Sequence, residues 1–211
     1  MNSRGPAKTL KVSVNTNWLN IHRRSKNLAI LDARSRQSYA KSHIPGAIHA
    51  DLFHYFVPGT DRKGLQIFQD DLSRLLGNMG LTGKETIVVY ESGFGMRASR
   101  VGWMVEYAGT RKVYLLEGGF QAWRKSQLPV ENKVVRPEQR TFRIRPVSRL
   151  LATADEIRSD RSAQILDVRS EGEFTGKANA EDEFLVLDGL SGQTSSMVER
   201  SSRQDPKWIA F

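Results

Sequence analysis

A six-residue string that occurs twice constrains the fold of this chain more than any other feature. Ile30–Ser35 reads ILDARS and Ile165–Ser170 reads ILDVRS, so five of the six positions are identical. An aromatic residue follows four positions after each string, Tyr39 in the first case and Phe174 in the second. A short string can recur by chance, but this pattern favours an internal duplication, with two copies of one folding unit offset by 135 residues.

Strand and helix signals alternate around the first string. Buried strands are predicted at 28–31, at 86–90, where β-branched and aromatic residues are continuous, and at 113–116. Helices are predicted at 16–24, 69–79, 96–108 and 120–125, and Gly80 and Gly109 are placed to end two of them. This alternation predicts an α/β fold with a mainly parallel sheet and helices on both faces.

The chain divides into two predicted domains. The first extends over residues 8–130. Residues 131–150 contain prolines, arginines and little periodicity, and we interpret them as an interdomain linker. The second domain, 151–211, opens with the helix-start signature Thr153–Glu156. From about residue 178 it no longer follows the pattern of the first copy, so we expect an incomplete second domain.

The charge is strongly positive, with 32 lysine and arginine residues against 23 aspartate and glutamate residues and a formal net charge of +9. Such an excess is typical either of a protein that binds nucleic acid or a membrane surface, or of a basic, solvated surface. The charges are scattered apart from one cluster, which has no aromatic residues alternating with it. We therefore expect a solvated surface and neither nucleic acid nor a membrane as partner. The cluster comprises Arg136, Arg140, Arg143, Arg145 and Arg149.

The chain contains no cysteine, which excludes disulfides, thiolate metal sites and cysteine nucleophiles together. His43 has no second ligand at helical spacing, so we predict no metal site, and no motif indicates a cofactor. No apolar run approaches the roughly 18 residues needed to cross a bilayer. The N-terminus has no apolar segment of the secretory type, so we expect a cytoplasmic protein.

Two motifs carry a resemblance to a known family. The first, YAKSHIPGA, begins at Tyr39, and the second, LEGGFQAW, begins at Leu116. Together they resemble the signatures of the rhodanese family, the thiosulfate and 3-mercaptopyruvate sulfurtransferases. The second motif departs from the family pattern at Leu116, where an aromatic is usual, and at Ala122, where an acid is usual. The resemblance implies a rhodanese-like domain with a five-stranded sheet, in the tandem order whose first domain is non-catalytic.

The resemblance also implies where the family's chemistry takes place. In the family, the strand equivalent to 87–90 ends in a cysteine, and the amides of the next loop and helix lower the thiol pKa and hold a persulfide. Glu91 stands in that position here, and a carboxylate cannot store sulfur as a persulfide. We predict that Glu91 is a fixed anion for the loop amides; the alternative is that Glu91 or Ser92 catalyses a different reaction. The loop equivalents are Glu91, Ser92, Gly93, Phe94, Gly95, Met96 and Arg97.

The other signature residues are interpreted as structural. Asp32 and Arg34 could form a catalytic pair, but an ion pair at a strand end accounts for them better, and their recurrence as Asp167 and Arg169 suits a scaffold role. His43 is expected to be hydrogen-bonded within the structure rather than catalytic, next to a tight Pro-Gly turn. The structural set is Asp32, Arg34, Tyr39, His43, Pro45, Gly46, Asp167 and Arg169.

We therefore predict a homologue of the rhodanese-type sulfurtransferases that is inactive by itself. Intact members of the family would take sulfur from a small donor through a cysteine persulfide. The 135-residue offset puts the second-copy counterpart of Glu91 near position 226, beyond Phe211, which predicts a truncated tandem protein. The alternative is a non-enzymatic rhodanese-like module that binds or regulates a protein partner.

Overall fold

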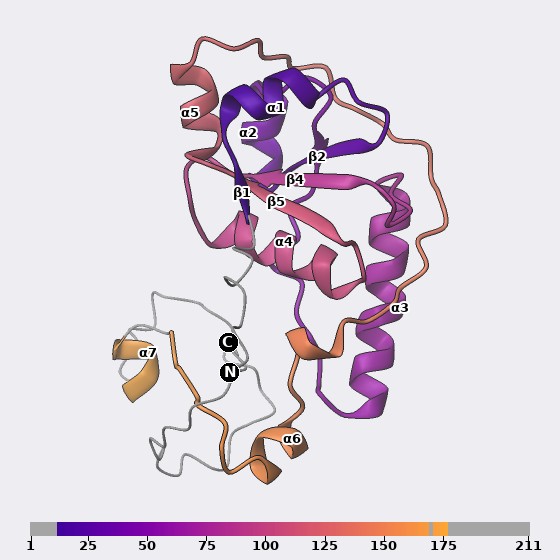
Figure 1. Cartoon of the computed structure of the whole chain (residues 1–211), viewed down its shortest axis with the longest axis vertical. Coiled ribbons are helices and arrows are strands. Elements are labelled where there is room, and N and C mark those ends of the chain that lie inside the picture. Colours follow the sequence, from indigo (N-terminus) through magenta and orange to yellow (C-terminus); the bar gives the residue numbers. More distant parts are fainter. Residues whose placement is uncertain (1–11, 169–170, 177–211) are drawn as a thin grey trace, which may run out of the picture. The chain divides into compact units, whose positions relative to one another are not determined.

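The computed structural model describes residues 12–168 and 171–176, in two compact units, Met1–Ser148 and Arg149–Phe211 (Figure 1). In the described residues, no helix is both long and apolar enough to cross a membrane. The first unit contains β1 (Ser13–Val14), α1 (Thr16–His22), β2 (Leu28–Asp32), α2 (Arg36–Lys41), β3 (Ile48–His49), α3 (Arg62–Asn78), β4 (Thr86–Tyr90), α4 (Met96–Tyr107), β5 (Lys112–Leu116) and α5 (Gly119–Lys125). A 3-10 turn, η1 (Ser148–Leu150), follows, and then α6 (Ala154–Ser159) and α7 (Glu171–Thr175).

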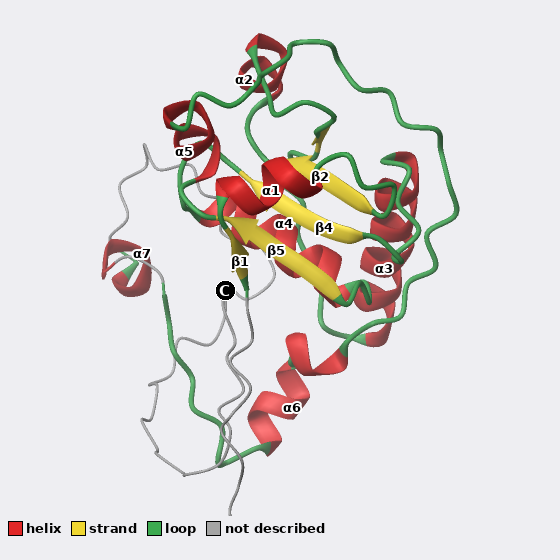
Figure 2. Ribbon diagram, turned by 45° about the horizontal axis from the view of Figure 1, so that its top comes forward, coloured by secondary structure: helices red, strands yellow, loops and turns green. Residues whose placement is uncertain are grey.

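The sheet of the first unit has five strands in the order β1-β5-β4-β2-β3, and every pairing is parallel. Figure 2 shows β1, β5, β4 and β2 side by side, with helices on both faces. The predicted α/β fold with a parallel five-stranded sheet is therefore confirmed. The outer strands β1 and β3 have two residues each, too few for a periodic pattern to mark them in the sequence.

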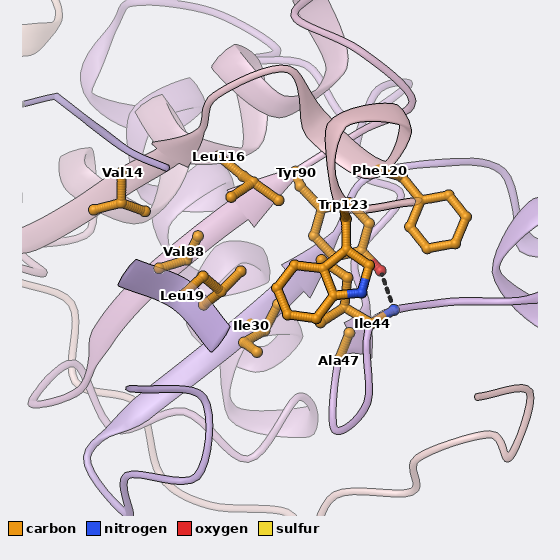
Figure 3. Close-up of a cluster of buried hydrophobic side chains, with 10 residues drawn as sticks. All are labelled: Val14, Leu19, Ile30, Ile44, Ala47, Val88, Tyr90, Leu116, Phe120 and Trp123. Atoms are coloured by element: carbon orange, nitrogen blue, oxygen red, sulfur yellow. Dashed lines mark hydrogen bonds between the residues drawn. The ribbon is translucent and has the colours of Figure 1, made fainter. Parts of the chain in front are cut away.

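The core forms because strand residues alternate between the two faces of the sheet. Ile30, Val88 and Tyr90 belong to one buried cluster, to which α1 contributes Leu19 and α5 contributes Trp123 (Figure 3). The intervening residues of the strands face the layer of α3 and α4. The helix α3 begins seven residues before the predicted start, because Asp61 accepts a hydrogen bond from Gly64 N at 2.6 Å and caps it.

Most of the predicted linker packs on the first unit. It runs from α5 around the outside of this unit to α3 (Figures 1 and 2). Phe142 is only 3% exposed, and its ring lies against Gly83. Its carbonyl oxygen accepts a hydrogen bond from Ser73 Oγ at 2.5 Å. We refer to residues 133–147 as the strap; a single buried aromatic in a polar segment gives no periodicity, so the sequence indicated a linker.

The strap also completes two helices. A helix end leaves backbone carbonyls without intrahelical partners. Arg140 N donates to Gly77 O at 2.9 Å near the end of α3, and Arg145 N donates to Ala108 O at 3.0 Å after the end of α4. The strap therefore supplies backbone donors to carbonyl groups at the ends of both helices.

The Gly77→Ala variant tests this contact. A methyl group at Gly77 would collide with the carbonyl oxygen of Arg140. Helix propensity alone would make the Gly77→Ala variant more stable than the unaltered protein by about 1 kcal/mol. The sign of the change in stability therefore separates helix propensity from the collision with Arg140. We expect a net loss of about 1–2 kcal/mol in urea unfolding and faster amide exchange at Arg140. Gly59→Ala, where the added carbon has ordinary contacts, is the control; a stabilised Gly77→Ala protein would contradict the docking of the strap.

The described residues of the second unit form helices and no strand. Its helix α6 starts as expected, with a capping box between Thr153 and Glu156, and α7 follows the second string as α2 follows the first. Residues 165–168, the counterpart of the β2 segment in the repeat, form no strand, and Ile165 and Leu166 are exposed. A parallel strand needs a neighbouring strand, and the described part of this unit contains none. Residues 177–211, including the predicted off-pattern tail, and Arg169 lie outside the described residues.

Candidate functional site

The candidate site lies at the carboxyl edge of the sheet, where β2 and β4 end in register. Asp32 is paired with Tyr90 across these two strands, and Glu91 follows directly. In parallel α/β sheets, this edge is where binding and catalytic groups collect. The sequence-predicted loop, Glu91–Arg97, therefore occupies the position at which the fold offers a site.

Glu91 caps the helix that follows the loop. Its Oε2 accepts a hydrogen bond from Ala98 N, in the first turn of α4, at 2.9 Å. The N-cap residue of that helix, Gly95, offers no side-chain bond, and the Glu91 carboxylate lies so close above it that an added methyl carbon would be 2.6 Å from Oε1. We expected the carboxylate to accept from the loop amides; it reaches past the loop to the helix instead.

The loop is fastened to α5 through its own carbonyl groups. Phe120 N donates to Glu91 O and Gln121 N donates to Ser92 O, both at 2.8 Å. Gly119 makes this approach possible, because it has a φ of +56° and a side chain there would collide with the carbonyl of Gly93. The second signature motif thus holds the first turn of α5 against the loop.

The outer side of the loop combines apolar and basic residues. Phe94 and Met96 are 73% and 71% exposed. Arg97 forms an ion pair with Asp51 at 3.0 Å, so its charge is already compensated. Arg100 donates to the carbonyl of Tyr55 at 2.8 Å, and burial lowers its pKa. No hydrogen bond joins the exposed Ser92 hydroxyl to a histidine in the described chain, so a serine–histidine pair has no support.

Asp32 and Arg34 form a buried ion pair behind the loop. The Arg34 guanidinium donates to both carboxylate oxygens, with the shortest contact at 2.6 Å, and lies 3.9 Å from the centre of the Phe120 ring. The Tyr90 hydroxyl donates to Asp32 at 2.6 Å and accepts from Ile44 N at 3.1 Å, the dashed bond in Figure 3. This network ties the strand end to the Pro-Gly turn.

The pKa directions agree with this arrangement. Burial would lower the pKa of Arg34, but the hydrogen bonds and charge of Asp32 outweigh it and raise the value, so the guanidinium stays charged. Burial, followed by the charge of Asp32, raises the pKa of Tyr90, which keeps its hydroxyl protonated as a donor. Asp32, Arg34 and Tyr90 therefore hold one another through hydrogen bonds and are not available to a substrate.

His43 is buried, and its contacts are with other residues of the domain. Its ring stacks on Tyr39 with centroids 4.0 Å apart, and its Nδ1 lies 2.8 Å from the carbonyl oxygen of Tyr39. Glu131 lies 3.7 Å from Nε2 and also accepts from Gly46 N at 2.7 Å. Pro45 and Gly46 form the turn between these contacts, with Gly46 at φ +82°. Asp167 lies in the second unit, and its predicted partner Arg169 is outside the described residues.

The site holds no sulfur nucleophile, and its amide at Ala98 and its cations Arg97 and Arg100 already have partners within the chain. The chain has no cysteine, and the described residues contain no group of acids or histidines that could hold a metal ion. Sequence reasoning missed Tyr90, Phe120 and Glu131 as parts of this region. Tyr90 was visible only as a strand residue, and the contacts of Phe120 and Glu131 join segments far apart in the sequence.

The fold and site define an α/β domain with a parallel five-stranded sheet. At the carboxyl end of its central strand lies a loop whose first residue, Glu91, caps the helix α4. The rhodanese-like domain family matches residues 15–126, more than half of the chain. The chain therefore belongs to the rhodanese family. The matched segment lies entirely within the first unit.

Characterised relatives agree with this assignment. The chain is 28% identical over 180 residues to thiosulfate sulfurtransferase of Rattus norvegicus, covering 77% of this chain and 61% of that protein. It is 27% identical over 200 residues to thiosulfate/3-mercaptopyruvate sulfurtransferase 1, mitochondrial, of Arabidopsis thaliana, covering 78% and 52% respectively. The crystal structure of the 3-mercaptopyruvate sulfotransferase SseA from Escherichia coli superimposes with a TM-score of 0.64 at 25% identity, covering 83% of this chain and 70% of that one. The chain thus spans about three fifths of the rat enzyme.

Proposed function

We propose that this chain is a non-catalytic rhodanese-like module, a homologue of the thiosulfate and 3-mercaptopyruvate sulfurtransferases without sulfur-transfer activity of its own. The observation that carries the proposal is Glu91. Its carboxylate stands where the family resemblance places the nucleophilic thiol, and it accepts the amide of Ala98 at 2.9 Å. The electropositive end of α4 is therefore already occupied by a covalently attached anion.

The chemistry of sulfur transfer supports the proposal. A thiolate attacks the outer sulfur of thiosulfate, sulfite leaves, and the sulfur stays on the protein as a persulfide until an acceptor removes it. A carboxylate cannot store sulfur in this form. Neither Glu91 nor any other residue of a chain without cysteine supplies the required thiolate. What remains is a folded domain with exposed surfaces, which suits binding to a protein partner.

A sulfur-transfer assay tests this directly. With thiosulfate and cyanide as substrates, we expect thiocyanate to form at the rate of the protein-free solution, and Glu91→Gln to leave that rate unchanged. Glu91→Gln retains the shape of the side chain and removes its charge, so it is a matched control for a carboxylate mechanism. Turnover above background that disappears in Glu91→Gln would overturn the proposal and make Glu91 a catalyst.

A further inference from the structure

The strap carries an excess of positive charge on a segment that is anchored to the first unit. All five of its basic residues are exposed, namely Lys133, Arg136, Arg140, Arg143 and Arg145. Its one acid is Glu138, which forms an ion pair with Arg140 at 3.3 Å. Among the described residues, no carboxylate forms an ion pair with Arg143 or Arg145, so their charges face solvent.

Further cations come from the part of the domain on which the strap rests. Gly83 lies against the ring of Phe142, and the neighbouring Lys84 is exposed. The backbone of Arg145 lies against Gly109, and Arg111 and Lys112 follow, both exposed. Glu85, the acid at this point, has both its oxygens engaged by Thr82. Charge from three segments of the chain thus gathers around the strap.

Between Arg140 and Arg143, the backbone of the strap has one edge bonded to the domain and the other edge free. In an extended chain, the N–H and C=O of one residue point to one edge, and those of the next residue point to the opposite edge. Arg140 N–H and the Phe142 carbonyl both bond to α3. The N–H groups of Thr141 and Arg143 therefore point to the other edge, where no described residue accepts from them. The free stretch ends there, because the next N–H on that edge, Arg145 N–H, donates to Ala108 O. An extended peptide can pair along such an edge.

We propose that the strap is a docking site for an extended acidic segment of a partner protein. The partner pairs its backbone with Thr141 and Arg143 and places carboxylates beside Arg143 and Arg145. Alternate residues of an extended peptide are about 7 Å apart, so acids at every second position reach cations two residues apart on the strap. The strap has no aromatic residue free to stack on bases, since Phe142 is buried, which favours a peptide over single-stranded nucleic acid. This inference goes beyond the proposed function, because it assigns a partner to a surface away from Glu91.

A peptide-binding measurement on the full chain tests the docking site. The probe is a short fluorescein-labelled peptide in which glutamate alternates with threonine, and its glutamine counterpart is the neutral control. Fluorescence anisotropy should show binding of the acidic peptide only, weakened by salt. The double variant Arg143→Glu/Arg145→Glu should raise Kd by about tenfold or more. The matched control Arg62→Glu/Lys63→Glu has the same charge change at the start of α3, about 15 Å along the helix from Ser73, which bonds to the strap, and should change Kd by less than about twofold.

Hydrogen exchange and a comparison with duplex DNA test the docking site further. Hydrogen exchange at Thr141 and Arg143 should slow when the peptide is added, because strand pairing occupies their N–H groups. If both double variants lost the same affinity for the peptide, the loss would depend only on the net charge of the protein. That result would overturn the docking site. Unchanged exchange at Thr141 and Arg143 would overturn the strand pairing. Tighter binding of duplex DNA, lost in Arg143→Glu/Arg145→Glu, would assign the surface to nucleic acid instead.

Discussion

Asp32→Ala should lower the free energy of unfolding by about 3–5 kcal/mol, the largest stability effect that we expect for a single change in this chain. Asp32 is fully buried and accepts hydrogen bonds from Arg34 and from the Tyr90 hydroxyl. Its removal leaves a buried guanidinium without a counter-ion and a buried hydroxyl without its acceptor. Urea unfolding, followed by tryptophan fluorescence, measures the change.

A double variant identifies the cause of that loss. Asp32→Ala/Arg34→Met removes both charges, so it should be more stable than Asp32→Ala alone, because the uncompensated cation is gone. The control is Asp71→Ala, which breaks the exposed pair with Arg74 and should leave the unfolding midpoint close to that of the unaltered protein. If the double variant were the less stable of the two, the penalty would come from lost packing and not from the unpaired charge.

Glu91→Cys should produce a thiol that is far more acidic than usual, with a pKa below about 7.5 compared with an ordinary value of about 8.5. The physical reason is the N-terminus of α4, where the N–H of Ala98 and the helix dipole now meet the Glu91 carboxylate. Because the chain has no cysteine of its own, the introduced thiol is the sole reporter. The pH dependence of its alkylation by iodoacetamide gives the pKa.

The same variant tests whether the loop can still hold sulfur. After incubation with thiosulfate, mass spectrometry should show one added sulfur atom, and cyanide should remove it as thiocyanate. Ser126→Cys is the matched control, since it places a thiol at the C-cap of α5, where the negative end of a helix opposes a thiolate. A thiol at position 91 that is no more acidic than the one at position 126 would show that the loop is not electropositive. The helix dipole would then not account for the carboxylate of Glu91 at this position.

Much of the first unit is predictable from local pattern. The run of β-branched residues at 86–90 and the glycines at positions 80 and 109 identified a central strand and two helix ends within a residue or two. The start of α3 was missed because its first three residues are two basic residues and a glycine, which carry no apolar periodicity. The first copy of the repeated string begins within β2, whereas residues 165–168 of the second copy form no strand. A repeated string carries the preference for a strand and not the neighbouring strand that must stabilise it.

The sequence by itself determined the family, the parallel α/β fold and the absence of any thiol, because these depend on composition, periodicity and short motifs. Only the tertiary structure decided what the side chains do. It placed Glu91 on the first turn of α4, joined Tyr90 to Asp32 across neighbouring strands, and seated Phe142 on the domain. Such contacts form between segments that the chain brings together only when the sheet and helices pack, so no local pattern encodes them.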